Sequence, residues 1–294
     1  MRLSFMRLSF MRLSFMRLSF MRLSVLFLAL LAAPAAWAQL AEGGARSLAL
    51  GRAALTLGAD AWHGHNPAAP ARLPGPALRA DASEAFRLRE LRLGAGAVAL
   101  PTRLGVASLN ARTYGAEAYR ETRLSAGLAR RLPLSPARRL DAGLALSYDA
   151  IAIEGFVPRS ALALSAGLHA DVLPALAAGV AARNVTALAR RPEDDLRLPA
   201  ASAAALAAGL AYRPAEGVLV LAEAEHDGAH GLALRGGLEA YPVPALALRL
   251  GAGSGPTRYS GGAGLRAGAL RVDLAAEWHA ALGLTPALSV AYAP

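Results

Sequence analysis

The chain has 294 residues, no cysteine, 55% hydrophobic residues and a formal net charge of +10. All 31 basic residues are arginine, five of them lie within the first 24 positions, and the rest are scattered among acidic residues. Half of the net charge therefore belongs to the extreme N-terminus, and the pattern excludes the clustered basic surface with which proteins bind nucleic acid.

The first 38 residues are typical of a targeting region and not of a folded domain. The unit MRLSF occurs four times before Met21, an apolar stretch follows, and Ala36-Trp37-Ala38 fits an A-x-A cleavage site. We expect a repeat and signal peptide over 1–38 that is removed, so that the mature chain begins at Gln39, and we interpret the repeats as a duplicated start region. Past this region no uninterrupted apolar run of about 18 residues occurs, so we expect no helical membrane anchor.

Residues 39–76 lack the alternation of polar and apolar side chains that marks the rest of the chain. The pair Asn66-Pro67 disfavours a continuing helix, because a residue before proline avoids the helical conformation. Gly64 permits a tight turn. We therefore expect a plug segment of short helices and turns, tucked into or across one mouth of the domain that follows, with candidate site residues Asp60, Trp62, Asn66 and Pro67.

From Ala77 onward, turn signals divide the chain into fourteen segments of alternating character. In 270–279 one parity is Leu, Val, Leu, Ala, Trp and the other is Arg, Asp, Ala, Glu, His, which only a strand can sort onto two faces. Residues 77–294 allot roughly 16 residues to each segment, enough for a spanning strand of about 9–11 residues and a turn. The segments are 77–86, 89–99, 102–112, 121–132, 138–153, 160–171, 176–186, 201–213, 217–227, 231–241, 245–253, 258–267, 270–279 and 284–292.

An apolar outer face with acidic, basic or histidine side chains on the inner face is typical of a transmembrane β-barrel. We therefore predict an all-β domain over 77–294, a closed antiparallel transmembrane barrel of about 14 strands in the bacterial outer membrane. The alanine-rich stretch 200–209 would favour a helix on its own, but Pro199 and Pro214 bracket a strand-length element, and we assign it to a strand. The predicted lumen residues, whose opposite charges could pair across strands, are Asp141, Asp149, Arg235, Glu239, Arg271, Asp273 and Glu277.

Several short motifs resemble the N-terminal signature of the FadL-like outer-membrane proteins, particularly the PorV/PorQ-like branch. They are Gly44 to Gly51, Asp60-Ala61-Trp62 and Asn66-Pro67-Ala68, and the stretch Gly179 to Val185 resembles a strand-end pattern of the same group. The resemblance implies a fourteen-stranded barrel whose N-terminal segment plugs or lines the pore. The chain departs from the family at Ala69-Pro70, where members usually have Gly-Leu.

Other kinds of site have weaker support in the sequence. His63 and His65 face one way on an extended segment and could bind a metal, but no third ligand is evident, so we interpret them as loop hydrogen-bonding residues and expect no metal or cofactor. Ser165 and His169 share an inward face, yet i, i+4 on one strand separates them by about 13 Å, too far for a nucleophile and its base. We therefore expect that the protein is not an enzyme.

Three function classes remain open. The resemblance implies either passage of small hydrophobic compounds across the outer membrane, or a secretion-associated or scaffold barrel that binds protein partners. An outer-membrane hydrolase is the third and least supported class. The expected partners are outer-membrane lipid and either a small hydrophobic ligand or proteins of a secretion machinery, with no nucleic acid.

Overall fold

The computed structural model describes residues 44–59, 65–135, 138–186, 204–227 and 231–294. The predicted signal peptide and its cleavage site therefore lie outside the described residues. Within the described part of the chain, no helix is both long and apolar enough to cross a membrane.

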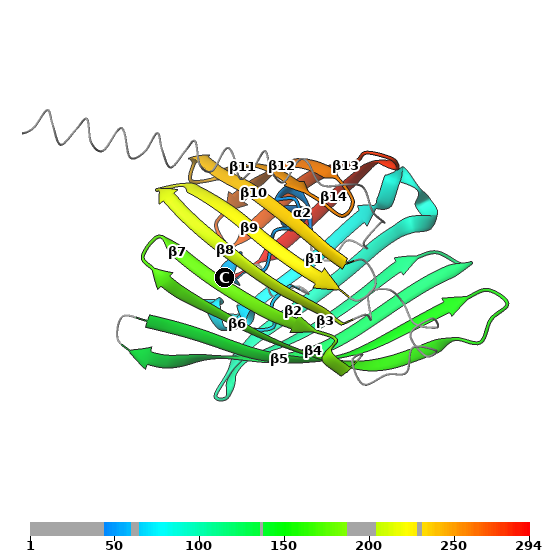
Figure 1. Cartoon of the computed structure of the whole chain (residues 1–294), viewed down its shortest axis with the longest axis horizontal. Coiled ribbons are helices and arrows are strands. Elements are labelled where there is room, and N and C mark those ends of the chain that lie inside the picture. The colour runs from blue at the N-terminus through cyan, green and yellow to red at the C-terminus, as the bar shows by residue number, and fades with distance from the viewer. Residues whose placement is uncertain (1–43, 60–64, 136–137, 187–203, 228–230) are drawn as a thin grey trace, which may run out of the picture.

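Fourteen strands form one closed antiparallel barrel (Figure 1), as the alternation predicted. Each strand pairs with the next along the chain, and β1 closes the ring against β14, where Ala80 faces Val290. The strands are β1 Ala77–Glu84, β2 Arg92–Thr102, β3 Gly105–Gly115, β4 Tyr119–Ser135, β5 Arg138–Ile153, β6 Arg159–Leu173, β7 Leu176–Arg183, β8 Ala205–Ala215, β9 Val218–Asp227, β10 Gly231–Val243, β11 Leu246–Gly253, β12 Arg258–Ala267, β13 Leu270–His279 and β14 Gly283–Tyr292.

The alternation of the sequence becomes an apolar outside and a polar inside. On β13, Leu274 and Trp278 are 58% and 53% exposed, whereas Asp273 and Glu277, which directly precede them, are 0% and 2% exposed. Leucine, valine and tyrosine side chains are exposed on the outward parity of the other strands as well. Because apolar side chains this exposed need an apolar solvent, the wall is that of a membrane-spanning barrel.

Several strand boundaries depart from the prediction by two or three residues, the clearest cases being the starts of β2 and β3. β2 begins three residues later than expected, because the short 3-10 turns η3 Ala85–Arg87 and η4 Arg89–Leu91 precede it. β3 also begins three residues later, because β2 extends to Thr102 and a two-residue link follows it. Phe86 and Arg87 have positive φ angles of 56° and 61°, a conformation that ends the β1 pairing. The alanine-rich eighth segment is a strand from Ala205, since pairing with β7 and β9 outweighs the helix propensity of alanine.

The two rims of the barrel differ in their connections. On one rim, which we call the short-turn rim, the six strand pairs from β2/β3 to β12/β13 are joined by links of two residues. The start of β1 and the end of β14 lie on this same rim, because each pair of antiparallel strands returns the chain to it. The opposite rim, the long-loop rim, carries every longer connection between the described strands.

Candidate functional site in the barrel lumen

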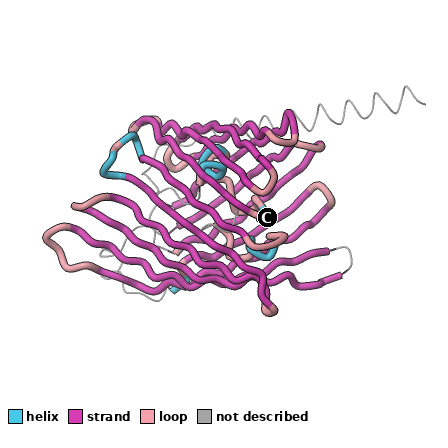
Figure 2. Tube along the Cα trace, turned by 180° about the vertical axis from the view of Figure 1, so that it is seen from behind, coloured by secondary structure: helices cyan, strands magenta, loops and turns pink. Residues whose placement is uncertain are grey.

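Residues 44–59 and 65–76 are here called the N-terminal segment. Most of the segment is buried inside the ring of strands (Figure 2), and only its last residues, among them Pro74 and Pro76, are exposed where the chain joins β1. The segment contains the short helix α2, Ala45–Ala49, and the 3-10 turn η2, Ala69–Arg72. All five residues of α2 are buried, and the helix contacts β11 to β14 and β1. The segment therefore occupies space that would otherwise belong to the lumen.

Three arginines of the N-terminal segment form ion pairs with carboxylates on the inner wall. Arg46 on α2 donates to both oxygens of Glu239 on β10, at 2.8 and 2.5 Å. The guanidinium of Arg52 donates in the same two-pronged way to Glu277 on β13, at 2.9 and 2.6 Å. The third cation, Arg72, lies 2.7 Å from a carboxylate oxygen of Asp141 on β5. Bidentate pairs fix both position and orientation, so these contacts hold the segment in one register against the wall.

Backbone amides of the same segment are also satisfied by the wall. Ala54 and Leu55 both donate to one carboxylate oxygen of Glu223 on β9, at 2.8 and 2.9 Å. The amide of Ala45 donates to the Ser289 hydroxyl at 2.6 Å. Irregular backbone inside a membrane protein must find partners within the protein, and here the wall supplies them.

The predicted pair Asn66-Pro67 sits deep in the lumen. Asn66 is 1% exposed, and its amide nitrogen donates to the carbonyls of Leu55 at 3.2 Å and of Leu168 on β6 at 3.1 Å. Pro67 lies so close to β5 that a Cβ at Gly143 would collide with the Pro67 carbonyl. Glycine at an inward wall position therefore makes room for the segment. The other inward glycines that meet it in the same way are Gly167, Gly237, Gly251 and Gly262.

An apolar layer joins the segment to the wall near the short-turn rim. Leu50, Ala54 and Leu57 of the segment belong to one buried cluster with side chains from the ends of six strands. Burying this surface against the wall stabilises the docked segment, at about 25 cal/mol per Å² of apolar area removed from water. The wall members of the cluster are Ala77, Ala97, Ala99, Val106, Ala177, Ala211, Leu219 and Leu221.

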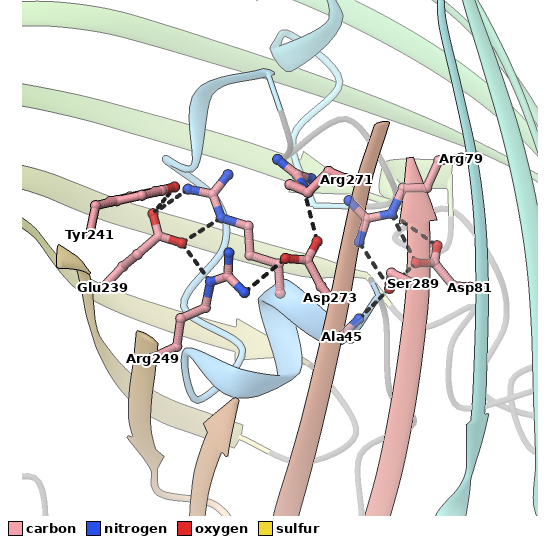
Figure 3. Close-up of polar contacts among 10 residues, drawn as sticks. Ala45, Arg79, Asp81, Glu239, Tyr241, Arg249, Arg271, Asp273 and Ser289 are labelled. Carbon is pink, nitrogen blue, oxygen red and sulfur yellow. Dashed lines mark hydrogen bonds and ion pairs between the residues drawn. The ribbon is translucent and has the colours of Figure 1, made fainter. Parts of the chain in front are cut away.

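The wall itself carries a chain of alternating charges that begins at Glu239 (Figure 3). Arg249 on β11 donates to Glu239 at 2.6 Å and lies 2.8 Å from Asp273 on β13, to which Arg271 donates at 3.0 Å. Tyr241 donates its hydroxyl proton to Glu239 at 3.0 Å. Each buried carboxylate in this chain meets at least two donors, which offsets much of the cost of keeping it out of water.

A second set of wall charges lies on β9 and β10 and on β4 and β5. Arg235 on β10 bridges Glu223 and Glu225 of β9, each at 3.0 Å. Arg123 on β4 pairs with Asp149 on β5. Between the segment and β3 to β7 remains a small polar cavity of about 60 Å³. Its polar lining includes Asn110, Arg123, Ser125, Ser147, Ser165 and Asn184.

The predicted lumen residues therefore face inward but do not form one cluster. Glu239, Arg271 and Asp273 belong to a single chain of charges, whereas Asp141 and Glu277 hold the N-terminal segment at separate points. Asp60 and Trp62 lie outside the described residues. The other two predicted lumen residues, Asp149 and Arg235, belong to the second set of wall charges.

Sequence reasoning missed some residues that carry the site. Arg249 and Glu223 lay on the inward parity of predicted strands, so the same alternation could have identified them. Arg52 sits in the non-alternating region and gives no local signal, because its partner is 225 residues away in the sequence. The lumen partners of irregular segments are set by the closed barrel and not by neighbours in the chain.

The histidines form no metal centre in the described part of the chain, where no three potential ligands come together. His65 is within 3.1 Å of the Ser47 hydroxyl, in keeping with a hydrogen-bonding role, and His63 lies outside the described residues. Ser165 accepts a hydrogen bond from the amide of Asn184 at 3.1 Å. His169 of β6 is buried, and it lies two residues closer to the short-turn rim than Gly167.

Solved structures share this architecture at low sequence identity. The "CymD monoaromatic hydrocarbon channel" aligns with a TM-score of 0.58 and 12% identity, over 86% of this chain and 98% of its own. A Pseudomonas aeruginosa FadL homologue aligns with a TM-score of 0.57 and 11% identity, over 86% of this chain and 99% of its own. The Pseudomonas putida toluene transporter TodX aligns with a TM-score of 0.56 and 11% identity, over 86% of this chain and 97% of its own. No family model and no curated protein matches the sequence.

The fold is that of the FadL-type outer-membrane barrels. In barrels of this class short turns face the periplasm and longer loops face the cell exterior. The short-turn rim is therefore the periplasmic one. On this orientation the apolar layer around Leu50 lies toward the periplasm, and the polar cavity around Asn110 lies farther toward the exterior.

Proposed function

We propose that the protein lets small hydrophobic compounds cross the outer membrane, and that the N-terminal segment is the plug that closes the path in the state described here. The observation that carries this proposal is the docking of the segment inside the lumen by three arginine ion pairs. Hydrocarbon channels and a toluene transporter share the fold, and this supports a hydrophobic solute.

The contacts of the segment suit a plug that can be displaced. They are ion pairs, amide hydrogen bonds and an apolar layer, and the cysteine-free segment is bonded to the wall only where the chain continues into β1. Moving Leu50 and Leu57 away from the wall would uncover the apolar layer near the periplasmic rim. A hydrophobic solute could replace the segment on that surface, because it would restore the burial that the movement removes.

A reversible cross-link tests whether displacement is needed. The Ala45 amide and the Ser289 hydroxyl are 2.6 Å apart, and the chain has no cysteine of its own, so the pair Ala45→Cys and Ser289→Cys can lock α2 to β14 without competing thiols. We expect the oxidised variant to lose uptake of radiolabelled toluene into Gram-negative cells, and a reductant to restore it.

The two single-cysteine variants, treated with the same oxidant, serve as controls and should take up toluene like the parent chain. Equal uptake by the locked and the reduced double variant would contradict a moving plug. No uptake above that of cells without the protein, in either state, would contradict the transport function itself.

A second candidate is a scaffold or secretion-associated barrel like the PorV/PorQ branch. The filled lumen favours it, since a barrel that only presents its rims to protein partners needs no open path. The same locked variant separates the two candidates: a scaffold would keep its partner binding, and would show no toluene uptake in the oxidised or the reduced state.

A further inference from the structure

A large apolar groove lies on the outer wall, away from the lumen. It has a volume of about 980 Å³ and runs across the outward faces of β4 to β10. Its sides are leucines that point into the membrane, among them Leu144 and Leu206, which are 57% and 63% exposed. The groove is thus a hollow in the lipid-facing surface and is separate from the plugged interior.

The hollow follows from the register of the strands. On the outward face Ala166 of β6 pairs with Ala182 of β7, and Ala208 of β8 pairs with Ala224 of β9. Diagonal steps of two residues join Ala142 of β5 to Ala166, and Ala182 to Ala208. Alanine leaves the wall lower than the leucines on both sides. These side chains therefore form the floor of one continuous path across five strands.

The path has the length of one membrane leaflet. Four strand spacings of about 4.8 Å give roughly 19 Å between the floor on β5 and the floor on β9. Because strands in such barrels tilt by about 45°, this path rises roughly 13 Å along the membrane normal, close to half of a hydrocarbon core of about 30 Å.

The periplasmic end of the groove carries one cation. Arg130 lines the groove, is exposed, and pairs across the strands with Ala142. Its neighbour Ala129 pairs with Val106, the second residue of β3, which puts Arg130 beside the periplasmic turn between β2 and β3, while β4 continues five residues farther to its own turn. Among the described residues Arg130 has no ion-pair partner. An arginine at the membrane boundary, next to apolar surface, attracts the phosphate of an anionic lipid.

We propose that this groove is a binding site for one anionic phospholipid of the periplasmic leaflet. Its phosphate lies on Arg130 and an acyl chain lies along the alanine floor. The arrangement fits a lipid because a charge at one end and an apolar path of one leaflet's length match a head group and a tail. The site does not depend on the passage of a solute through the barrel.

Native mass spectrometry of the detergent-purified protein with added phosphatidylglycerol tests the site. We expect Arg130→Gln to weaken binding of the first lipid about five-fold, the effect of one arginine near a membrane surface. Ala182→Leu, which fills the floor, should weaken it as well. Arg120→Gln removes an exposed outward arginine at the other end of β4, and Ala276→Leu fills an outward position on β13. Both should bind like the parent chain.

Binding of phosphatidylcholine, which carries no net charge, is measured in parallel for comparison. Equal binding of the two lipids by the parent chain, or equal weakening by Arg130→Gln and Arg120→Gln, would overturn the proposal. A dimer whose abundance falls in Ala182→Leu would also overturn it, because a second copy would then cover the groove. Heat-modifiable mobility on a gel shows that each variant still forms the barrel.

Discussion

The arginines of the N-terminal segment each meet carboxylates that are almost completely buried. Glu277 is 2% exposed, and Arg52 makes two hydrogen bonds to it. Replacing one member of such a pair leaves the other charge buried without a partner. Replacing both members by apolar side chains of similar size leaves no buried charge. The interaction is therefore tested by a double-mutant cycle and not by one substitution.

Arg52→Met should loosen the segment by about 3–5 kcal/mol, since it leaves the carboxylate of Glu277 buried and unpaired. The double variant Arg52→Met and Glu277→Met should recover most of this loss. Rates of limited proteolysis within the segment measure the effect. Arg92→Met is the control, because its pair with Glu84 is exposed and is worth about 0–1 kcal/mol. Equal protection of the single and the double variant would show that the pair does not hold the segment.

At the scale of the strand, depth in the membrane decides what a charge costs. Leu274 and Leu270 lie on the same outward face of β13, one near its middle and one at its periplasmic end. An arginine on the lipid face costs about 2–4 kcal/mol at midplane and about 0–1 kcal/mol near the interface.

Leu274→Arg should therefore lower the free energy of unfolding far more than Leu270→Arg, as measured by urea titration in lipid vesicles. The inward neighbour Ala275 would be a poor control, because it packs against Ala45, Leu48 and Ala49 of α2. Equal losses for the two leucine variants would contradict the assignment of this face to lipid.

Strands and their faces could be predicted because a strand's signal is local. The inward set of β5, from Asp141 to Asp149, followed from alternation alone, and the structure confirms it. The start of β2 could not be predicted, since the turns around Phe86 depend on backbone angles that no simple pattern marks. Arg52 could not be assigned to Glu277, because that contact exists only once the barrel has closed.

At the scale of the whole molecule, the segment changes both the width and the charge of the lumen. It fills the space next to β11 to β14 and brings three arginines against wall carboxylates. Without it Glu277, Asp141 and Glu239 would face the lumen with fewer cations. Without the segment, the lumen should therefore be wider, and it should favour the passage of cations over anions more than the lumen of the intact chain does.

Single-channel conductance in planar bilayers shows whether the N-terminal segment closes the lumen. The chain lacking residues 44–72 is compared with the intact chain, with heat-modifiable mobility on a gel as the check that the barrel still forms. The account predicts a sharp rise in conductance and a shift of the reversal potential toward cation selectivity. An intact barrel with unchanged conductance would contradict it, because the segment would then not be what closes the lumen.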